Sequence, residues 1–198
     1  MREDAAVIAS AFRGSLAALG REPAWYRFFD LSRRGLVLSF LAAGATLPAY
    51  LVVARASETE RAIVMGEAVR AIPHLWVLGA ALAYTLAFPF VAVVSTTLFG
   101  RTERYAGWVV ARHWTVFFIA WAVAGLFGLY LAGALPYRIP NFIGLVAWFG
   151  VLAADIRLAR KVGGLGLGAA VLVGSIVMSL AMSLALMVLL LYLGSAPT

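Results

Sequence analysis

Apolar residues occupy five long stretches of the chain, separated by short polar segments. The stretches cover residues 35–54, 73–99, 114–135, 141–156 and 168–193. Most of them are close to the ~20 residues that an α-helix needs to cross the hydrocarbon core of a bilayer. None is long enough to hold two spans, since that would take about 40 residues. The pattern therefore predicts an all-α fold, a polytopic transmembrane helix bundle of five spans.

A shorter amphipathic pattern precedes the first span. Apolar residues recur at helical spacing over residues 5–20, and a segment in which aromatic residues alternate with arginines follows. Such sequences lie in the plane of the membrane interface. We therefore expect residues 1–34 to form a cytoplasmic, interfacial segment, with Phe12 and Phe29 in lipid, and residues 35–198 to form the five-span transmembrane domain.

Two local signals modify the helices around the first two spans. Ser57 and Glu60 match the S-x-x-E capping box, which predicts the start of a separate surface helix over residues 58–70, with Arg70 near its end. Pro89 lies inside the second apolar stretch, where it removes one backbone hydrogen bond and predicts a kink.

Composition supports a membrane protein. Of the 198 residues, 64% are hydrophobic and only 13% are charged, against about 45–50% and about 25% in a typical soluble domain. The net charge is +7, but the basic residues flank apolar stretches, where they bind anionic lipid headgroups and fix orientation. We therefore expect a lipid bilayer with anionic lipids as partner, and no nucleic acid. The chain has no cysteine, which excludes disulfides and thiolate metal sites.

The distribution of basic residues predicts the orientation. The N-terminal segment and the second and fourth loops share one side and hold six, three and three Lys or Arg residues. The other side holds four: Arg55, Arg61, Arg70 and Arg138. The positive-inside rule therefore predicts a cytoplasmic N-terminus and an outer C-terminus. Arginine in place of lysine, with abundant Ala and Gly, is typical of a GC-rich bacterium, so we expect the bacterial cytoplasmic (inner) membrane.

No cofactor or metal is expected from the histidines or glycines. His74 begins the second span and His113 precedes the third, so they lie near opposite membrane faces, roughly 30 Å apart. They are too far apart to bind one haem iron. The glycine-rich segment 163–168 follows a span instead of a β-strand, which favours a flexible turn over a phosphate loop.

Asp155 is the acidic residue that falls within a predicted span. Ionisable groups at membrane depth are costly and often functional. It lies near the inner edge of the fourth span, and Arg112 and His113 lie at matching depth beside the third. We expect an inter-helix polar clamp of Asp155 with Arg112 or His113, reached by water and worth about 0–1 kcal/mol. A proton or substrate role for Asp155 is the alternative.

Small residues recur along the last span. Ser175, Ser179 and Ser183 are four residues apart and share one helix face, which predicts a helix-packing stripe, extended by Ala170 and Gly174. A nucleophilic serine would need an activating base, and no nucleophile motif surrounds these residues. We therefore expect no catalytic residue, and a chain that is not an enzyme.

The last two spans and their connection resemble the bacterial branch of the Yip (Ypt-interacting protein) family. The resemblance covers residues 140–195: Trp148 within the fourth span, a basic turn over 157–161, Gly164–Leu165, and a small-residue span from Ala169. Membership would imply five spans after a cytoplasmic segment, and a membrane-shaping, trafficking or scaffold role through partners, without chemistry.

Two functions follow from these patterns. The first is a non-enzymatic membrane scaffold or accessory subunit, acting through helix packing with other membrane proteins or with itself. The alternative is a small transporter or permease subunit, supported by Pro89 and Asp155. The feature that distinguishes them is a hydrated cavity lined by polar groups. A dry bundle favours the scaffold, whereas a midplane cavity holding Tyr84, Thr85 or Asn141 favours transport.

Overall fold

The chain folds into α-helices joined by short connections. The computed structural model describes residues 2–66, 68 and 71–194, and these contain no β-strand. The elements are α1 (Arg2–Leu19), η1 (Trp25–Phe28), α2 (Arg33–Gly44), α3 (Leu47–Met65), α4 (His74–Leu98), η2 (Thr102–Arg104), α5 (Tyr105–Leu131), α6 (Arg138–Lys161) and α7 (Leu167–Gly194). Five helical segments of the described chain are long and apolar enough to cross a membrane. The predicted polytopic transmembrane bundle is confirmed.

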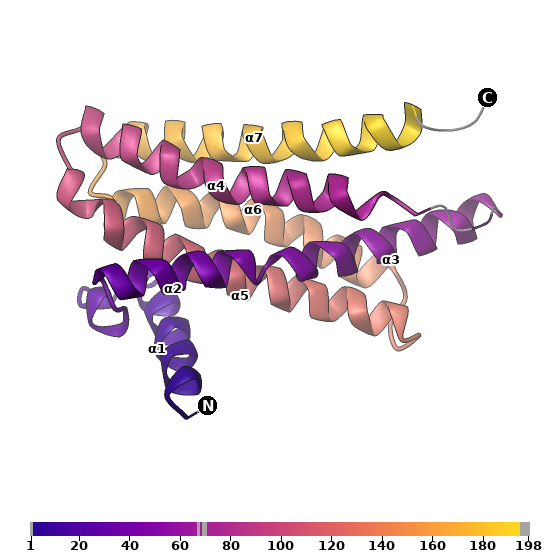
Figure 1. Ribbon diagram of the computed structural model, residues 1–198, viewed down its shortest axis with the longest axis horizontal. Helices are drawn as coiled ribbons and strands as arrows, with labels where there is room; N and C mark the ends of the chain where they lie inside the picture. The colour runs from indigo at the N-terminus through magenta and orange to yellow at the C-terminus, as the bar shows by residue number, and fades with distance from the viewer. Residues whose placement is uncertain (1, 67, 69–70, 195–198) are drawn as a thin grey trace.

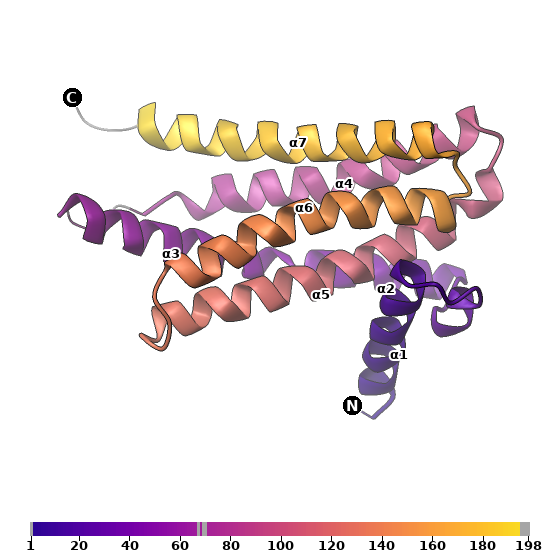
Figure 2. The same cartoon turned by 180° about the vertical axis from the view of Figure 1, so that it is seen from behind.

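The spans run side by side, and α1 projects sideways from them near one end (Figures 1 and 2). This α1 end also holds the connections from α4 to α5 and from α6 to α7, and the far end holds the other two. Neighbouring spans contact one another in the cyclic order α3, α5, α6, α7, α4 and back to α3. The five spans therefore enclose a central axis.

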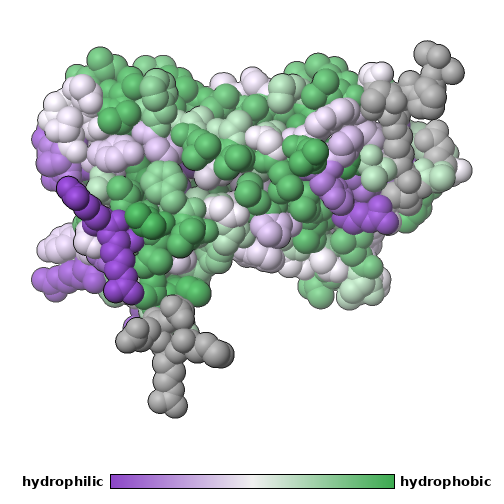
Figure 3. Space-filling view, viewed as in Figure 1, coloured by the Kyte–Doolittle hydropathy of each residue, from purple (hydrophilic) through white to green (hydrophobic). Residues whose placement is uncertain are grey.

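The outer surface of the bundle is apolar. Hydrophobic residues cover most of the middle of the face in Figure 3, and hydrophilic residues gather towards the two ends. Leu75 is 82% exposed, Phe90 69% and Leu98 75%. A surface of this kind is unfavourable in water and suited to lipid.

Two helices extend past their apolar stretches. α5 begins at Tyr105 and α6 ends at Lys161, so Arg112 and His113, which precede the third apolar stretch, lie inside a helix. A hydropathy average falls at such polar residues whether or not they are paired. The structure buries both side chains within the bundle.

The first span is broken in its middle. α2 ends at Gly44 and α3 starts at Leu47, with Pro48 in its first turn. Proline has no backbone N–H to donate, and the chain passes through a turn at Ala45 and Thr46. The carbonyl of Ala45 accepts a hydrogen bond of 3.0 Å from the indole Nε1 of Trp121, which satisfies a group that the break leaves without its helical partner.

The predicted surface helix over 58–70 is wrong. α3 continues without interruption to Met65, and Ser57 donates to the Val53 carbonyl one turn earlier at 3.0 Å. Ser57 is therefore an interior helical residue and not an N-cap. Arg70 lies outside the described residues.

α1 exposes one apolar face. Val7, Ile8 and Phe12 are 40%, 44% and 47% exposed, and the Phe12 ring contacts the ring of Phe118 at 5.1 Å. Phe29, which we expected in lipid, is instead buried. It folds back over α1, so close to Gly14 that a Cβ there would lie 2.7 Å from its ring.

The predicted packing stripe on α7 does not face another helix of this chain, so that prediction is wrong. Ser175, Ser179 and Ser183 are exposed, whereas Ala170 and Gly174 are buried. A step of five residues, as from Ala170 to Ser175, turns a helix by about 140°, so the serines lie on the opposite side. A Cβ at Gly174 would come within 2.8 Å of the side chain of Ile156, so the close approach occurs there.

Candidate functional site

The centre of the bundle is filled at the α1 end and open in the other half. Near α1, the side chains of Phe88, Trp108, Arg112 and His113 are buried, and the rings of Phe88 and Trp108 are 5.6 Å apart. Beyond Tyr84, the five spans surround a cavity of about 570 Å³. That volume falls in the range of roughly 300–1,000 Å³ typical of small-molecule sites.

Small residues on every span create this cavity. Its wall includes one or more alanines from each helix: Ala49, Ala81, Ala120, Ala147 and Ala185. A methyl group does not reach the bundle axis, so the ring of helices stays hollow where these residues face inward. Most of the remaining lining is aliphatic.

Two tyrosines close the cavity towards the α1 end. Tyr50 of α3 and Tyr84 of α4 line its inner limit. The hydroxyl oxygen of Tyr84 accepts a hydrogen bond of 2.6 Å from Nη2 of Arg112. Arg112 in turn donates from Nε to Oδ1 of Asp155 at 2.7 Å and from Nη2 to Oδ2 at 3.2 Å. A buried ion pair therefore supports the floor of the cavity.

The structure brings Asp155 and Arg112 together but not where water reaches them. Their side chains are 6% and 2% exposed, and the guanidinium carbon lies 4.0 Å from the centre of the Phe88 ring. The expected cost of about 0–1 kcal/mol applies to exposed pairs and is therefore wrong. Breaking a buried pair leaves an uncompensated charge and costs more.

His113 takes no part in this ion pair. Its Nδ1 lies 3.2 Å from Oγ of Ser39, which itself lies 2.7 Å from the Leu36 carbonyl. With the Ser39 proton donated to that carbonyl, its oxygen accepts from Nδ1–H. Nε2 has no hydrogen-bond partner among the described residues.

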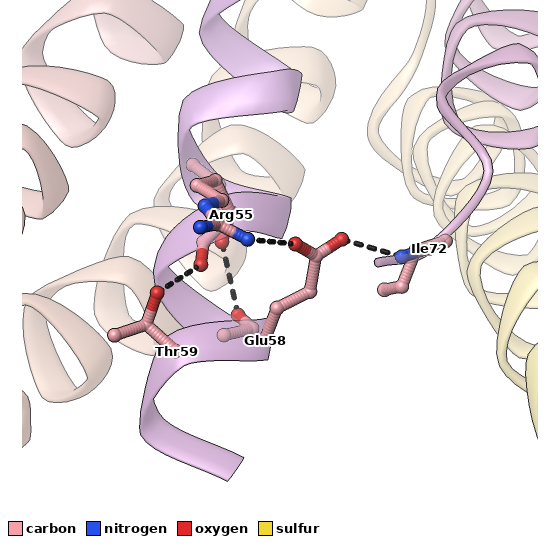
Figure 4. Close-up of polar contacts among 6 residues, drawn as sticks. Arg55, Glu58, Thr59 and Ile72 are labelled. Atoms are coloured by element: carbon pink, nitrogen blue, oxygen red, sulfur yellow. Dashed lines mark hydrogen bonds and ion pairs between the residues drawn. The ribbon is translucent and has the colours of Figure 1, made fainter. Parts of the chain in front are cut away.

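A buried carboxylate holds the far end of the bundle. Glu58 of α3 accepts a hydrogen bond of 2.6 Å from the backbone N–H of Ile72, and Arg55 lies 3.2 Å from its other oxygen (Figure 4). Ile72 precedes α4 and lines the cavity. Glu58 therefore fixes the chain at the cavity rim.

Two more residues of the same segment tie α3 to its neighbours. The Ser57 hydroxyl lies 3.3 Å from that of Tyr137, the residue before α6. Glu60 accepts a hydrogen bond of 2.9 Å from the hydroxyl of Tyr130 in α5. The sequence pattern that we interpreted as a helix cap therefore contains three residues that contact α5 or the residues just before α4 and α6. Local spacing cannot distinguish the two arrangements.

Only two of the three polar residues that we expected at a transport site line the cavity. Tyr84 and Asn141 line the cavity, and Thr85 does not. Thr85 is buried and donates to the Ala81 carbonyl of its own helix at 2.8 Å. Within the part of the chain that the structure describes, no three His, Asp or Glu side chains come together as a metal site.

No protein-family model, curated protein or solved structure matches this chain. The resemblance to the Yip family therefore stays a prediction. The fold itself defines the class, a polytopic transmembrane helix bundle with an internal cavity.

Proposed function

We propose that this protein binds an apolar small molecule within the bilayer and acts as a small transporter or permease subunit. The observation that supports this most directly is the cavity of about 570 Å³, lined by all five spans and by Tyr84 and Asn141. In this proposal the chain catalyses no reaction. Arg112 and Asp155 are paired with each other and serve to hold the cavity floor.

The wall of the cavity argues for an occupant. The cavity is open on part of its wall, where Leu145 and Ala185 are exposed. Apolar walls that no neighbouring atom touches lose dispersion contacts, so an apolar molecule that enters gains them. Water stabilises such a space only where polar groups bind it, and this wall is mainly aliphatic. A hydrocarbon chain or ring is the occupant that fits.

The cavity differs from both expectations, because its wall is mainly aliphatic instead of polar and yet the bundle is not packed solid. We take the transport alternative in the form of a carrier or subunit for an apolar molecule, since a scaffold that acts by packing alone has no use for a hollow centre. An accessory role remains part of the proposal, because five spans cannot form two equal inverted halves within one chain. We propose that the protein works with other membrane proteins or further copies of itself, in a bacterial inner membrane, with its N-terminus in the cytoplasm.

The exposed apolar face of α1 and the arginines beside it support contact with the membrane surface. The exposed large apolar residues of α1 follow helical spacing: Val7, Ile8, Phe12 and Leu16. Arg21, Arg27, Arg33 and Arg34 lie in and around the connection from α1 to α2 and are also exposed. We propose that this segment lies on an anionic lipid surface, which attracts such cations.

Filling the cavity tests the proposal. Ala120→Phe places a ring in the cavity, and Ala122→Phe places the same ring on the outside of α5, where Ala122 is exposed and lines no part of the cavity. Lipophilic molecules retained through purification are extracted and measured by mass spectrometry. We expect wild type and Ala122→Phe to retain one enriched species and Ala120→Phe to lose most of it. Equal retention by both variants contradicts the proposal.

A further inference from the structure

The hydroxyl of Tyr84 has an unused donor. Its oxygen accepts from Arg112 at 2.6 Å, and the guanidinium has no acceptor atom to offer in return. Among the described residues, the hydrogen bond of this hydroxyl is the one that it accepts, and it donates none. Tyr84 is one of the residues that line the cavity, so an acceptor on a bound molecule can reach it.

The surroundings of Tyr84 determine the charge of the group that it can bind. Arg112 is paired through two hydrogen bonds to Asp155, so the floor carries no net charge. A carboxylate or phosphate placed there would lose its hydration without gaining a counter-ion, which costs several kcal/mol. A carbonyl, ether or hydroxyl oxygen loses much less. Donation by Arg112 also polarises the phenol and strengthens the hydrogen bond that it donates.

The shape of the cavity determines the rest of the ligand. Tyr84 lies at its inner limit, and Asn141 lies at the far end of the bundle, in the first turn of α6. The wall between them is mainly alanine and branched aliphatic residues. At roughly 30 Å³ for a water-sized group, about 570 Å³ holds about 20 heavy atoms.

We propose that the cavity binds a neutral amphiphile with a carbonyl or hydroxyl oxygen at its inner end, hydrogen-bonded by Tyr84, and a hydrocarbon part along the aliphatic wall. This inference rests on the proposed function, since it requires that the cavity binds an apolar molecule. It goes further by naming the recognised group, its charge and the residue that binds it.

Three probes that share a chain of about twelve carbons test the inference: methyl laurate, laurate and dodecane. The full-length protein is reconstituted in lipid nanodiscs, and binding is measured as the probe retained in excess of protein-free discs. We expect methyl laurate to bind most tightly. Tyr84→Phe should weaken methyl laurate binding about five- to tenfold, the value of one hydrogen bond, and leave dodecane binding unchanged.

The matched control is Tyr105→Phe, which removes a phenol at the α1 end of α5 that does not line the cavity. It should leave the binding of all three probes as in wild type. Retained dodecane binding shows that the Tyr84→Phe variant is folded. Laurate binding as tight as methyl laurate, or equal loss of ester and alkane in Tyr84→Phe, overturns the inference alone. No excess binding of any probe to wild type overturns the proposed function and the inference with it.

Discussion

Arg112 joins three spans through one side chain. It lies on α5, bonds Asp155 of α6 at 2.7 Å, and donates to Tyr84 of α4 at 2.6 Å. Taking an arginine and a carboxylate out of water costs several kcal/mol per ion. The two-point geometry, the Tyr84 acceptor and the aromatic face of Phe88 together offset that cost. The pair therefore specifies how three helices meet, more than it adds net stability.

Breaking this pair should destabilise the protein strongly. Asp155→Asn leaves the Arg112 charge buried without its counter-ion, and we expect a loss of about 3–5 kcal/mol of unfolding free energy. The measurement is unfolding in mixed detergent micelles with increasing SDS. Replacing both members, Arg112→Met with Asp155→Leu, should recover much of the loss, because apolar replacements of similar volume often match a buried pair.

Glu103 supplies the control for that experiment. It lies 3.8 Å from Arg104 at the surface, with both side chains about half exposed. Glu103→Gln should change stability by less than about 1 kcal/mol, as is typical of exposed pairs. A loss in Asp155→Asn as small as in Glu103→Gln would contradict the buried clamp.

Among the elements, α1 depends most on a contact distant in sequence. Its last carbonyls accept hydrogen bonds from α6: Lys161 lies 2.7 Å from the Ala17 carbonyl, and Arg157 lies 2.6 Å from that of Gly20. Cations at a helix C-terminus are favoured by the helix dipole. The basic residues that we used to predict orientation therefore also attach α1 to the end of the bundle.

Removing both cations should release α1. In Arg157→Met with Lys161→Met, a spin label at position 12 should become more mobile, and amides of α1 should exchange about tenfold faster or more, since each bond to a charged group contributes about 1.5–3 kcal/mol. Arg160→Met is the control, because Arg160 is exposed on the same turn. Unchanged mobility in the double variant would show that the apolar contacts of α1 suffice to hold it.

For the whole molecule, an odd number of spans places α1 and the end of α7 on opposite sides of the membrane. The structure puts α1 at one end of the bundle and the end of α7 at the other (Figure 1). The cavity lies in the half away from α1, so the proposed orientation opens it towards the outer leaflet. A molecule taken up there would come from the outer side of the membrane.

Reporter fusions test this orientation. Fusions after residues 30, 68, 101, 134, 164 and 198 should alternate in location, beginning in the cytoplasm, because each pair of neighbouring sites is separated by one span. Alkaline phosphatase and green fluorescent protein report the outer and inner sides. Two neighbouring sites on the same side would contradict the five-span topology, and a complete inversion would contradict only the orientation.

Hydropathy alone was enough to predict the bundle. The five apolar stretches identify the five spans because a backbone segment in lipid must form its hydrogen bonds internally, as an α-helix does. The helical pattern of residues 5–20 likewise predicted α1. Matching depth in neighbouring spans was enough to name Arg112 as a possible partner for Asp155. These features depend on local spacing and on distance from the ends of the spans.

The direction in which each helix faces was decided only by the tertiary structure. In a soluble protein, polar residues identify the side of a helix that faces solvent. Lipid is as apolar as the protein core, so the sequence of a membrane span does not show which side faces lipid. That is why Ser179 was assigned to the packed side and Gly174 to the same stripe. It is also why Ala81, Ala120 and Ala185 gave no sign of a common cavity. Only the rotation of all five helices about their axes brings these methyl groups to one place and forms the cavity between them.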